Sequence, residues 1–246
     1  MPTPVNHLPE STPLPADTET MKTFMGMLAH EMRTQVAGIC TASTILLEER
    51  GSGKRLQQYL SHIKYSGEDL LHVLDNMMAT ATVGNGNLDI TLKDTRVQLR
   101  EWLKLHLRQY NLITAVRDIK LKTVVHRSVP EYITTDVIKL GQVLKNLIDN
   151  AIKHSPPNSY ISITIHPLGD NRLLFQVTDQ GVGIPEDKIH LLFQPFRQLD
   201  NGLAGTGLGL YISKLYATSL GGDVMIGSNH NSGTTFLLLI THKTDA

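Results

Sequence analysis

The chain has 246 residues, which is the length of about two ordinary domains. Its 23 basic and 23 acidic residues cancel, so the composition gives no reason to expect binding to nucleic acid or to a membrane surface. One cysteine, Cys40, excludes an intramolecular disulfide, and the scattered histidines form no zinc motif. Without a signal peptide or an apolar run of roughly 18 residues, we expect a cytoplasmic chain or the cytosolic part of a membrane-bound protein.

The first third of the chain predicts a helical hairpin. Residues 1–18 contain five prolines and predict a flexible leader. Residues 19–82 follow as two helical segments separated by a break at 51–53. The second segment has an apolar seam with alternating spacings of four and three, formed by Leu56, Leu60, Ile63, Gly67, Leu70, Leu74 and Met77. Because one hairpin cannot enclose both apolar seams, we expect two copies to form a four-helix bundle; the alternative is that the seam packs on the next domain.

Residues 83–87 (Val-Gly-Asn-Gly-Asn) predict a hinge, and residues 88–246 predict a second domain. The expected strands cover 88–92, 119–125, 161–165, 173–178, 224–228 and 234–240, and the expected helices cover 99–116, 136–154 and 212–220. Asp136 is the expected N-cap of the long helix, and residues 169–171 are an expected hairpin turn. Intermixed helices and mostly antiparallel strands predict a two-layer α/β sandwich, so the fold class of the whole chain is α+β.

Two glycine-rich turns are candidate nucleotide contacts. Asp179 ends a strand and is followed by Gly181 and Gly183, so the carboxylate could accept a hydrogen bond from the exocyclic amine of adenine. Taken alone, this motif is also typical of a surface turn. The second turn precedes a helix, where free backbone N–H groups and the helix dipole favour phosphate. Its residues are Gly205, Thr206, Gly207, Leu208 and Gly209.

The long helix contains Asn146, Asn150 and Lys153 on one face, among residues that are otherwise largely apolar. Amide oxygens are hard ligands that suit Mg²⁺, and a lysine could neutralise phosphate. The alternative is a solvated polar stripe.

His30 in the first helix is followed by Glu31 and, four residues later, by Thr34. A neutral imidazole is a competent nucleophile near pH 7, and an adjacent carboxylate can accept its proton. Thr34 could position a water molecule for the reverse, hydrolytic reaction. A lone histidine on a helix is more often structural.

These segments together resemble the sequence boxes of sensor histidine kinases. The resemblance runs from about Thr20 to Ile240, in family order: an H box at 30–34, an N box at 136–155, a first glycine box at 179–185, an F box at 192–196 and a second glycine box at 205–214. It implies a dimerisation and phosphotransfer hairpin followed by an ATP-binding domain of the Bergerat type. The implied cofactors are ATP and Mg²⁺. The implied partners are a second copy of the chain and the receiver domain of a response regulator.

The resemblance also implies a role for each matched residue. His30 is the phosphoacceptor, Glu31 its base and Thr34 the residue for dephosphorylating the regulator. In the implied nucleotide site, Asn146 is the magnesium ligand, and Asn150 and Lys153 lie near the phosphates. Asp179 reads the adenine, and Gly181 and Gly183 lie beneath the base. The base of the lid comprises Gly205, Gly207 and Gly209, and its anchor comprises Phe193 and Phe196.

The sequence departs from the family at Gln35, where the family usually has a proline that bends the helix. The segment 197–204 is short and predicts a small lid. One rival interpretation is a gyrase-type ATPase, although Asn146 occupies the position where those enzymes have a catalytic glutamate. Another is a signalling scaffold that binds nucleotide without phosphorylating itself.

Overall fold

A computed structural model describes residues 18–48, positions 56, 59, 60, 63, 66, 67, 70 and 74, and residues 90–243 except 170, 198–206, 231 and 232. The predicted leader before Thr18, the loop at 51–53 and the hinge at 83–87 lie outside these residues. The described residues form two compact units, one built on helix α1 and the other beginning at Ile90. No helix in this described part of the chain combines the length and apolar character needed to span a bilayer.

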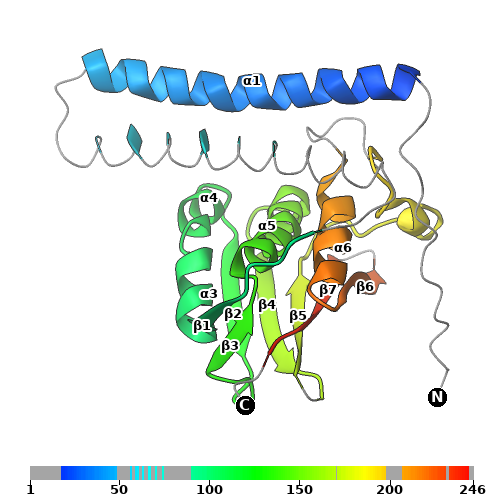
Figure 1. The fold of residues 1–246 in the computed structure, drawn as a ribbon. Coiled ribbons are helices and arrows are strands. Elements are labelled where there is room, and N and C mark those ends of the chain that lie inside the picture. Colours follow the sequence, from blue (N-terminus) through cyan, green and yellow to red (C-terminus); the bar gives the residue numbers. More distant parts are fainter. Residues whose placement is uncertain are drawn as a thin grey trace. The chain divides into compact units, whose positions relative to one another are not determined.

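Helix α1 (Thr18–Glu48) is one uninterrupted helix of 31 residues that passes through Gln35 without a break (Figure 1). Six of the seven members of the predicted second seam are described, and all six are helical. Three of its leucines are exposed, to 44% at Leu56, 51% at Leu60 and 36% at Leu74. The chain alone therefore leaves part of this apolar seam uncovered.

The second unit is organised by a five-stranded sheet of order β2-β4-β5-β7-β6. Its strands are β2 (Lys120–Val125), β4 (Tyr160–Pro167), β5 (Arg172–Thr178), β7 (Gly233–Thr241) and β6 (Asp223–His230). Neighbouring strands are antiparallel except β2 and β4, which are parallel. The expectation of mostly antiparallel strands is confirmed.

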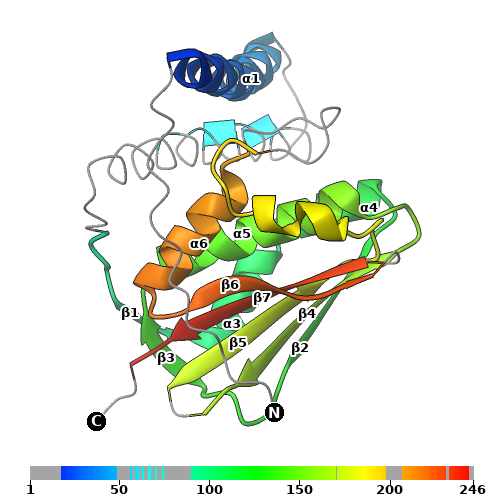
Figure 2. The ribbon, with the colours of Figure 1, turned by 90° about the vertical axis from the view of Figure 1, so that its right-hand side faces the viewer.

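Helices α5 (Val137–His154) and α6 (Gly209–Ser219) pack together over one face of this sheet (Figure 2). Alternate strand residues are fully buried, among them Ile161, Ile163 and Ile165 on β4. Helix α5 contributes the other layer of the core through Leu140, Val143, Leu144, Leu147 and Ile148, which are also fully buried. The predicted two-layer α/β sandwich is therefore confirmed.

Asp136 caps helix α5 as predicted. Its Oδ1 accepts hydrogen bonds from the backbone N–H groups of Ile138 and Lys139, both at 3.0 Å. Its Oδ2 accepts a further bond of 2.8 Å from the backbone N–H of Lys93. One buried carboxylate therefore satisfies orphan donors of the helix and also holds the segment that enters this unit.

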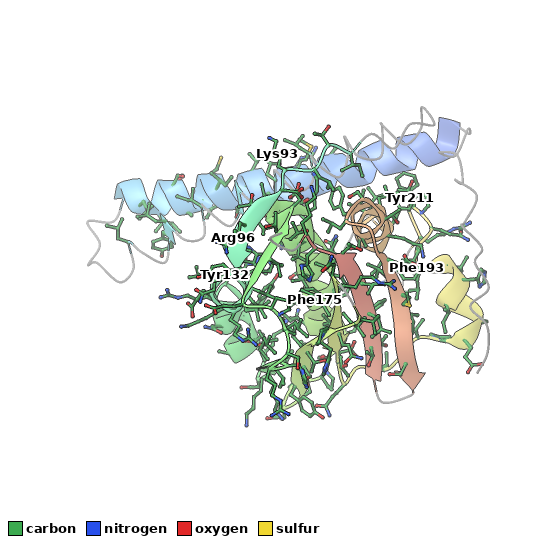
Figure 3. The ribbon with its side chains drawn as sticks, turned by 60° about the horizontal axis from the view of Figure 1, so that its bottom comes forward. Lys93, Arg96, Tyr132, Phe175, Phe193 and Tyr211 are labelled. Atoms are coloured by element: carbon green, nitrogen blue, oxygen red, sulfur yellow. The ribbon has the colours of Figure 1, made fainter. Side chains whose placement is uncertain are left out.

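Three predictions about the start of this unit were wrong or incomplete. Of the strand predicted at 88–92, residues 88 and 89 lie outside the described residues, and residues 90–92 form no strand. The Lys93 N–H bonds to Asp136, and strand pairing begins only at β1 (Thr95–Gln98). Strand β1 pairs with β3 (Tyr132–Thr135), a strand that was not predicted; Arg96 stacks over the Tyr132 ring across this pair (Figure 3). The predicted helix 99–116 is two helices, α3 (Leu99–Leu107) and α4 (Tyr110–Val116), because the Gln109 side chain bonds the His106 carbonyl at the junction. A short 3₁₀ helix, η1 (Glu186–Leu191), was also not predicted.

Candidate functional site

Asp179 immediately follows strand β5, and its carboxylate is held by backbone groups. Its Oδ1 accepts hydrogen bonds from the N–H of Gly181 at 2.8 Å and of Thr234 at 3.2 Å. The side chain is buried, with 7% of its surface exposed. Burial raises the pKa of Asp179, and the two backbone bonds and the nearby His154 only partly offset that effect. None of the described residues donates a hydrogen bond to the second carboxylate oxygen, which can accept one from a ligand.

The turn after Asp179 requires glycine at its tightest point. A Cβ atom at Gly181 would lie 2.7 Å from the His154 carbonyl oxygen and 2.9 Å from Asp179 Oδ1. Gly183 has a φ of 75°, the left-handed conformation that glycine adopts readily. The backbone of this turn therefore lies against the C-terminal end of helix α5, and a flat ligand could approach it closely.

The N-terminus of helix α6 offers a site for an anion. Leu208 precedes the helix, and its apolar side chain makes no capping hydrogen bond to the first turn. No acidic residue occupies its first turn, so the helix dipole attracts negative charge without opposition from within that turn. Gly207 and Gly209 are placed at this end as predicted, whereas Gly205 and Thr206 lie outside the described residues.

Asn146 connects helix α5 to this end of α6. Its Nδ2 donates hydrogen bonds to the Gly209 carbonyl at 3.0 Å and to Ser213 Oγ at 3.1 Å. A carbonyl oxygen can only accept, so the nitrogen side of the amide must face Gly209. The Asn146 oxygen accepts no hydrogen bond from the described residues. It is therefore a free hard ligand beside the helix terminus.

Asn150 and Lys153 continue the same face of α5 and are half-buried. About 12 Å of helix separates Asn146 from His154, whose carbonyl contacts the Asp179 turn. Helix α5 thus links the two ends of the site. Within the described residues, no cluster of three or more His, Cys, Asp or Glu side chains could hold a metal ion. The amide oxygen of Asn146 suits an ion whose remaining ligands come from water and phosphate, as is usual for Mg²⁺.

Phe193 contacts helix α6 and Phe196 contacts the residues just before it; their role as a lid anchor stays a prediction. The Lys214 ammonium is 4.9 Å from the centroid of the Phe193 ring and also pairs with Asp223 at 3.1 Å. The Phe196 N–H donates to the Gly207 carbonyl at 3.1 Å. This bond joins the residues that precede and follow the segment 197–206.

The three remaining predicted site residues belong to the first unit. His30, Glu31 and Thr34 lie on helix α1, and Thr34 is exposed. The side chains of His30 and Glu31 are outside the described residues.

Two residues with direct contacts in the site were missed from the sequence. Thr234 bonds Asp179 from a strand 55 residues away, and Ser213 bonds Asn146 across 67 residues. The only local signal was the position of Ser213, one helical turn after Gly209, which places both on one face of the helix.

Both parts of the chain match known domain families. Residues 20–86 match the His Kinase A (phospho-acceptor) domain, and residues 135–244 match the histidine kinase-, DNA gyrase B- and HSP90-like ATPase family. The catalytic domain of the histidine kinase ThkA has a similar structure, with a TM-score of 0.54 and 25% identity over 61% of this chain and 95% of that one. Full-length ShkA in complex with AMPPNP shares the fold, with a TM-score of 0.64 and 21% identity over 92% of this chain and 46% of that one.

Curated relatives extend well beyond this chain. The circadian input-output histidine kinase CikA of Synechococcus elongatus is 29% identical over 90% of this chain, which spans 30% of that protein. An uncharacterized sensor-like histidine kinase of Rhizobium meliloti is 33% identical over 91% of this chain, which spans 43% of that protein. With its phosphoacceptor domain and its ATPase domain, the chain belongs to the sensor histidine kinases of two-component systems.

Proposed function

We propose that the chain uses Mg²⁺ and ATP to phosphorylate its own His30 and then transfers the phosphoryl group to an aspartate of a response regulator receiver domain. One observation carries the proposal. The same chain combines a phosphoacceptor-type helix bearing His30 with an ATPase-type site. In that site, Asp179 and Asn146 each have an oxygen that accepts no hydrogen bond from the described residues. A gyrase-type ATPase would not need a phosphoacceptor helix.

In this proposal the nucleotide extends along helix α5. Asp179 accepts a hydrogen bond from the adenine amine, and Gly181 and Gly183 let the backbone approach the base. The triphosphate reaches the N-terminus of α6, with Asn150 and Lys153 beside it. Residues 205–209, including Gly205 and Thr206, form the base of a lid over the phosphates.

Asn146 is the proposed magnesium ligand, because the Gly209 carbonyl engages its amide nitrogen and its oxygen accepts no hydrogen bond from the described residues. Bound Mg²⁺ would neutralise charge that develops on the transferring phosphate. Asn146, Asn150 and Lys153 position the triphosphate, and their main contribution to the rate is orientation.

The chemical step is an in-line displacement. A nitrogen of the His30 imidazole attacks the γ-phosphorus, the bond to the β,γ-bridging oxygen breaks, and ADP leaves. Glu31 accepts the proton from the other ring nitrogen as the nitrogen–phosphorus bond forms. Residues 19–82 serve as the phosphotransfer hairpin, 83–87 as the hinge and 88–246 as the catalytic domain that swings about it.

The proposed active form is a homodimer. The exposed leucines Leu56, Leu60 and Leu74 support this proposal, because a second hairpin would cover an apolar seam that the chain alone leaves open. We further propose a cytoplasmic location and a phosphatase activity towards the regulator, with Thr34 orienting the attacking water. Thr34→Ala should then slow dephosphorylation of the regulator and leave the labelling of His30 intact.

Incubation with γ-labelled ATP and Mg²⁺ tests the proposal. We expect label that is labile in acid and stable in alkali, as a phosphohistidine is. His30→Gln should abolish it, whereas the matched substitution His126→Gln, at an exposed histidine beyond strand β2, should retain it. ATP binding without any label would favour a signalling scaffold, and label persisting in His30→Gln would mean that another residue is the acceptor.

A further inference from the structure

Ser213 is fully buried at the contact between helices α5 and α6, with 0% of its surface exposed. Its hydroxyl donates to the Gly209 carbonyl at 2.8 Å, one turn earlier in the same helix. A hydroxyl has one proton, and this bond uses it. Toward Asn146, Ser213 Oγ can therefore only accept, and it accepts from Nδ2 at 3.1 Å.

The Asn146 amide, the Gly209 carbonyl and the Ser213 hydroxyl are joined by three hydrogen bonds, and the donor of each bond is fixed. Both acceptors that face Asn146, the Gly209 carbonyl and Ser213 Oγ, require the nitrogen side of the amide. Rotating the amide by half a turn would place its oxygen against two oxygen atoms and lose both bonds, which is unfavourable in a buried setting. The two acceptors therefore fix where the Asn146 oxygen points.

We propose that Ser213 is a positioning residue for magnesium, which holds the Asn146 amide with its oxygen toward the metal. This inference rests on the proposed function, in which that oxygen binds Mg²⁺. Ser213 itself does not touch the metal or the nucleotide phosphates; it acts through the orientation of Asn146. Groups that orient a metal ligand in this way typically change metal affinity by 10- to 100-fold when they are removed.

Ser213→Ala removes one of the two acceptors and leaves the Gly209 carbonyl in place. We expect the Mg²⁺ concentration for half-maximal tightening of nucleotide binding to rise about tenfold, the lower end of that range, because one acceptor remains. Nucleotide affinity measured in EDTA should be unchanged, because the adenine contact at Asp179 does not involve Ser213.

The experiment uses the full chain and the non-hydrolysable nucleotide AMPPNP, with binding measured by calorimetry over a Mg²⁺ titration and again in EDTA. Ser219→Ala is the matched control. It is the same substitution in the same helix, and the Ser219 hydroxyl bonds the Tyr216 carbonyl at 2.8 Å rather than a side chain of α5. Ser219→Ala should follow wild type in both conditions.

Asn146→Ala separates failure of the inference from failure of the proposed function. If this variant keeps the wild-type dependence on Mg²⁺, Asn146 is not the metal ligand and both proposals are overturned. If Asn146→Ala loses the dependence while Ser213→Ala matches wild type, only the role of Ser213 is overturned. Equal weakening of Ser213→Ala with and without Mg²⁺ would mean that Ser213 shapes the pocket and does not position the metal ligand.

Ser213→Cys provides a second test that keeps the buried volume nearly filled. A thiol is a weak hydrogen-bond acceptor, so this variant should also need more Mg²⁺ than wild type. A wild-type Mg²⁺ requirement in Ser213→Cys would show that packing, and not the hydrogen bond, is what matters, and would overturn the inference. Melting temperatures of all variants verify that they are folded.

Discussion

The two ends of the candidate nucleotide site are built by different means. At the base end, Asp179 is held by backbone N–H groups of Gly181 and Thr234, on a turn that lies against the end of α5. At the phosphate end, Asn146 is held by one carbonyl and one side chain of α6. The base end is therefore fixed by the path of the chain, whereas one of the two contacts that hold the phosphate end is a side-chain hydroxyl.

This difference gives the two ends different sensitivities to substitution. At the base end, any side chain added at Gly181 collides with main-chain atoms, which cannot move without displacing helix α5 or strand β5. At the phosphate end, a change at Ser213 alters the orientation of one amide and leaves the fold intact. Substitutions at the base end should affect all nucleotide binding, and those at the phosphate end only its dependence on Mg²⁺.

The largest expected effect is that of Asp179→Asn on nucleotide choice. The asparagine oxygen can still accept from Gly181 and Thr234, but its NH₂ group then meets the adenine amine, and two donors face each other. We expect ATP affinity to fall about 100-fold, the size of an unpaired buried polar group, and the preference for ATP over GTP to collapse. Competition binding with both nucleotides measures this. Undiminished ATP preference would mean that Asp179 does not read the base.

Gly181→Ala should distort the turn that follows Asp179. The new Cβ would lie 2.7 Å from the His154 carbonyl, so the turn or the end of α5 has to move. We expect a loss of about 1–3 kcal/mol in the free energy of unfolding, together with weaker nucleotide binding in EDTA as well as in Mg²⁺. Chemical denaturation and calorimetry report the two quantities. Gly26→Ala, where an added Cβ contacts nothing, is the matched control.

Asp136→Ala acts further from both ends. It removes the N-cap of α5 and the bond to the Lys93 N–H, so we expect a loss of about 1–2 kcal/mol in the free energy of unfolding. Nucleotide affinity should change little, because Asn146 is oriented by α6 and not by the start of α5. Asp149→Ala, which removes the exposed-side ion pair with Lys145, should cost about 0.3–0.5 kcal/mol. Equal losses for the two variants would contradict the role of the cap.

The smallest expected effect is the pH dependence of stability without nucleotide. Burial raises the pKa of Asp179 in the folded chain, so ionising it opposes folding. The stabilisation from its neutral form is present at low pH and is lost as pH rises through the folded pKa. Asp179→Asn does not ionise and so does not lose this stability. Its melting temperature should therefore exceed that of wild type at pH 7, and the difference in melting temperature should narrow as the pH is lowered. A difference that widens in acid would contradict this.

Most of the fold of the second unit could be predicted, because the sequence patterns that indicate it are local. The apolar periodicity of α5, the capping residue Asp136 and the alternation in β4 each depend on neighbours within a few residues. The break between α3 and α4 could not be predicted, because the pattern of leucines continues across it without glycine or proline. Strand β3 is four residues long and exists through its pairing with β1, which no local pattern indicates.

The candidate site, too, could be predicted only where its signals are local in the sequence. Asp179, Asn146 and the glycine turns are recognisable by residue type and spacing. The contacts that orient them are not, because Thr234 and Ser213 reach their partners only after the sheet and the α5–α6 layer have assembled. Ordinary serine and threonine residues in a helix or strand give no signal of this role in the sequence.

We propose that one chain binds ATP through Asp179 and Asn146 and phosphorylates His30. The most direct test measures Mg²⁺-dependent ATP binding and γ-label incorporation on the same samples of wild type, His30→Gln and Asn146→Ala. We predict that His30→Gln binds ATP as wild type does and takes no label, whereas Asn146→Ala loses the label together with the Mg²⁺-dependent binding. Wild type that binds ATP without taking label, or full labelling of Asn146→Ala, would contradict the account.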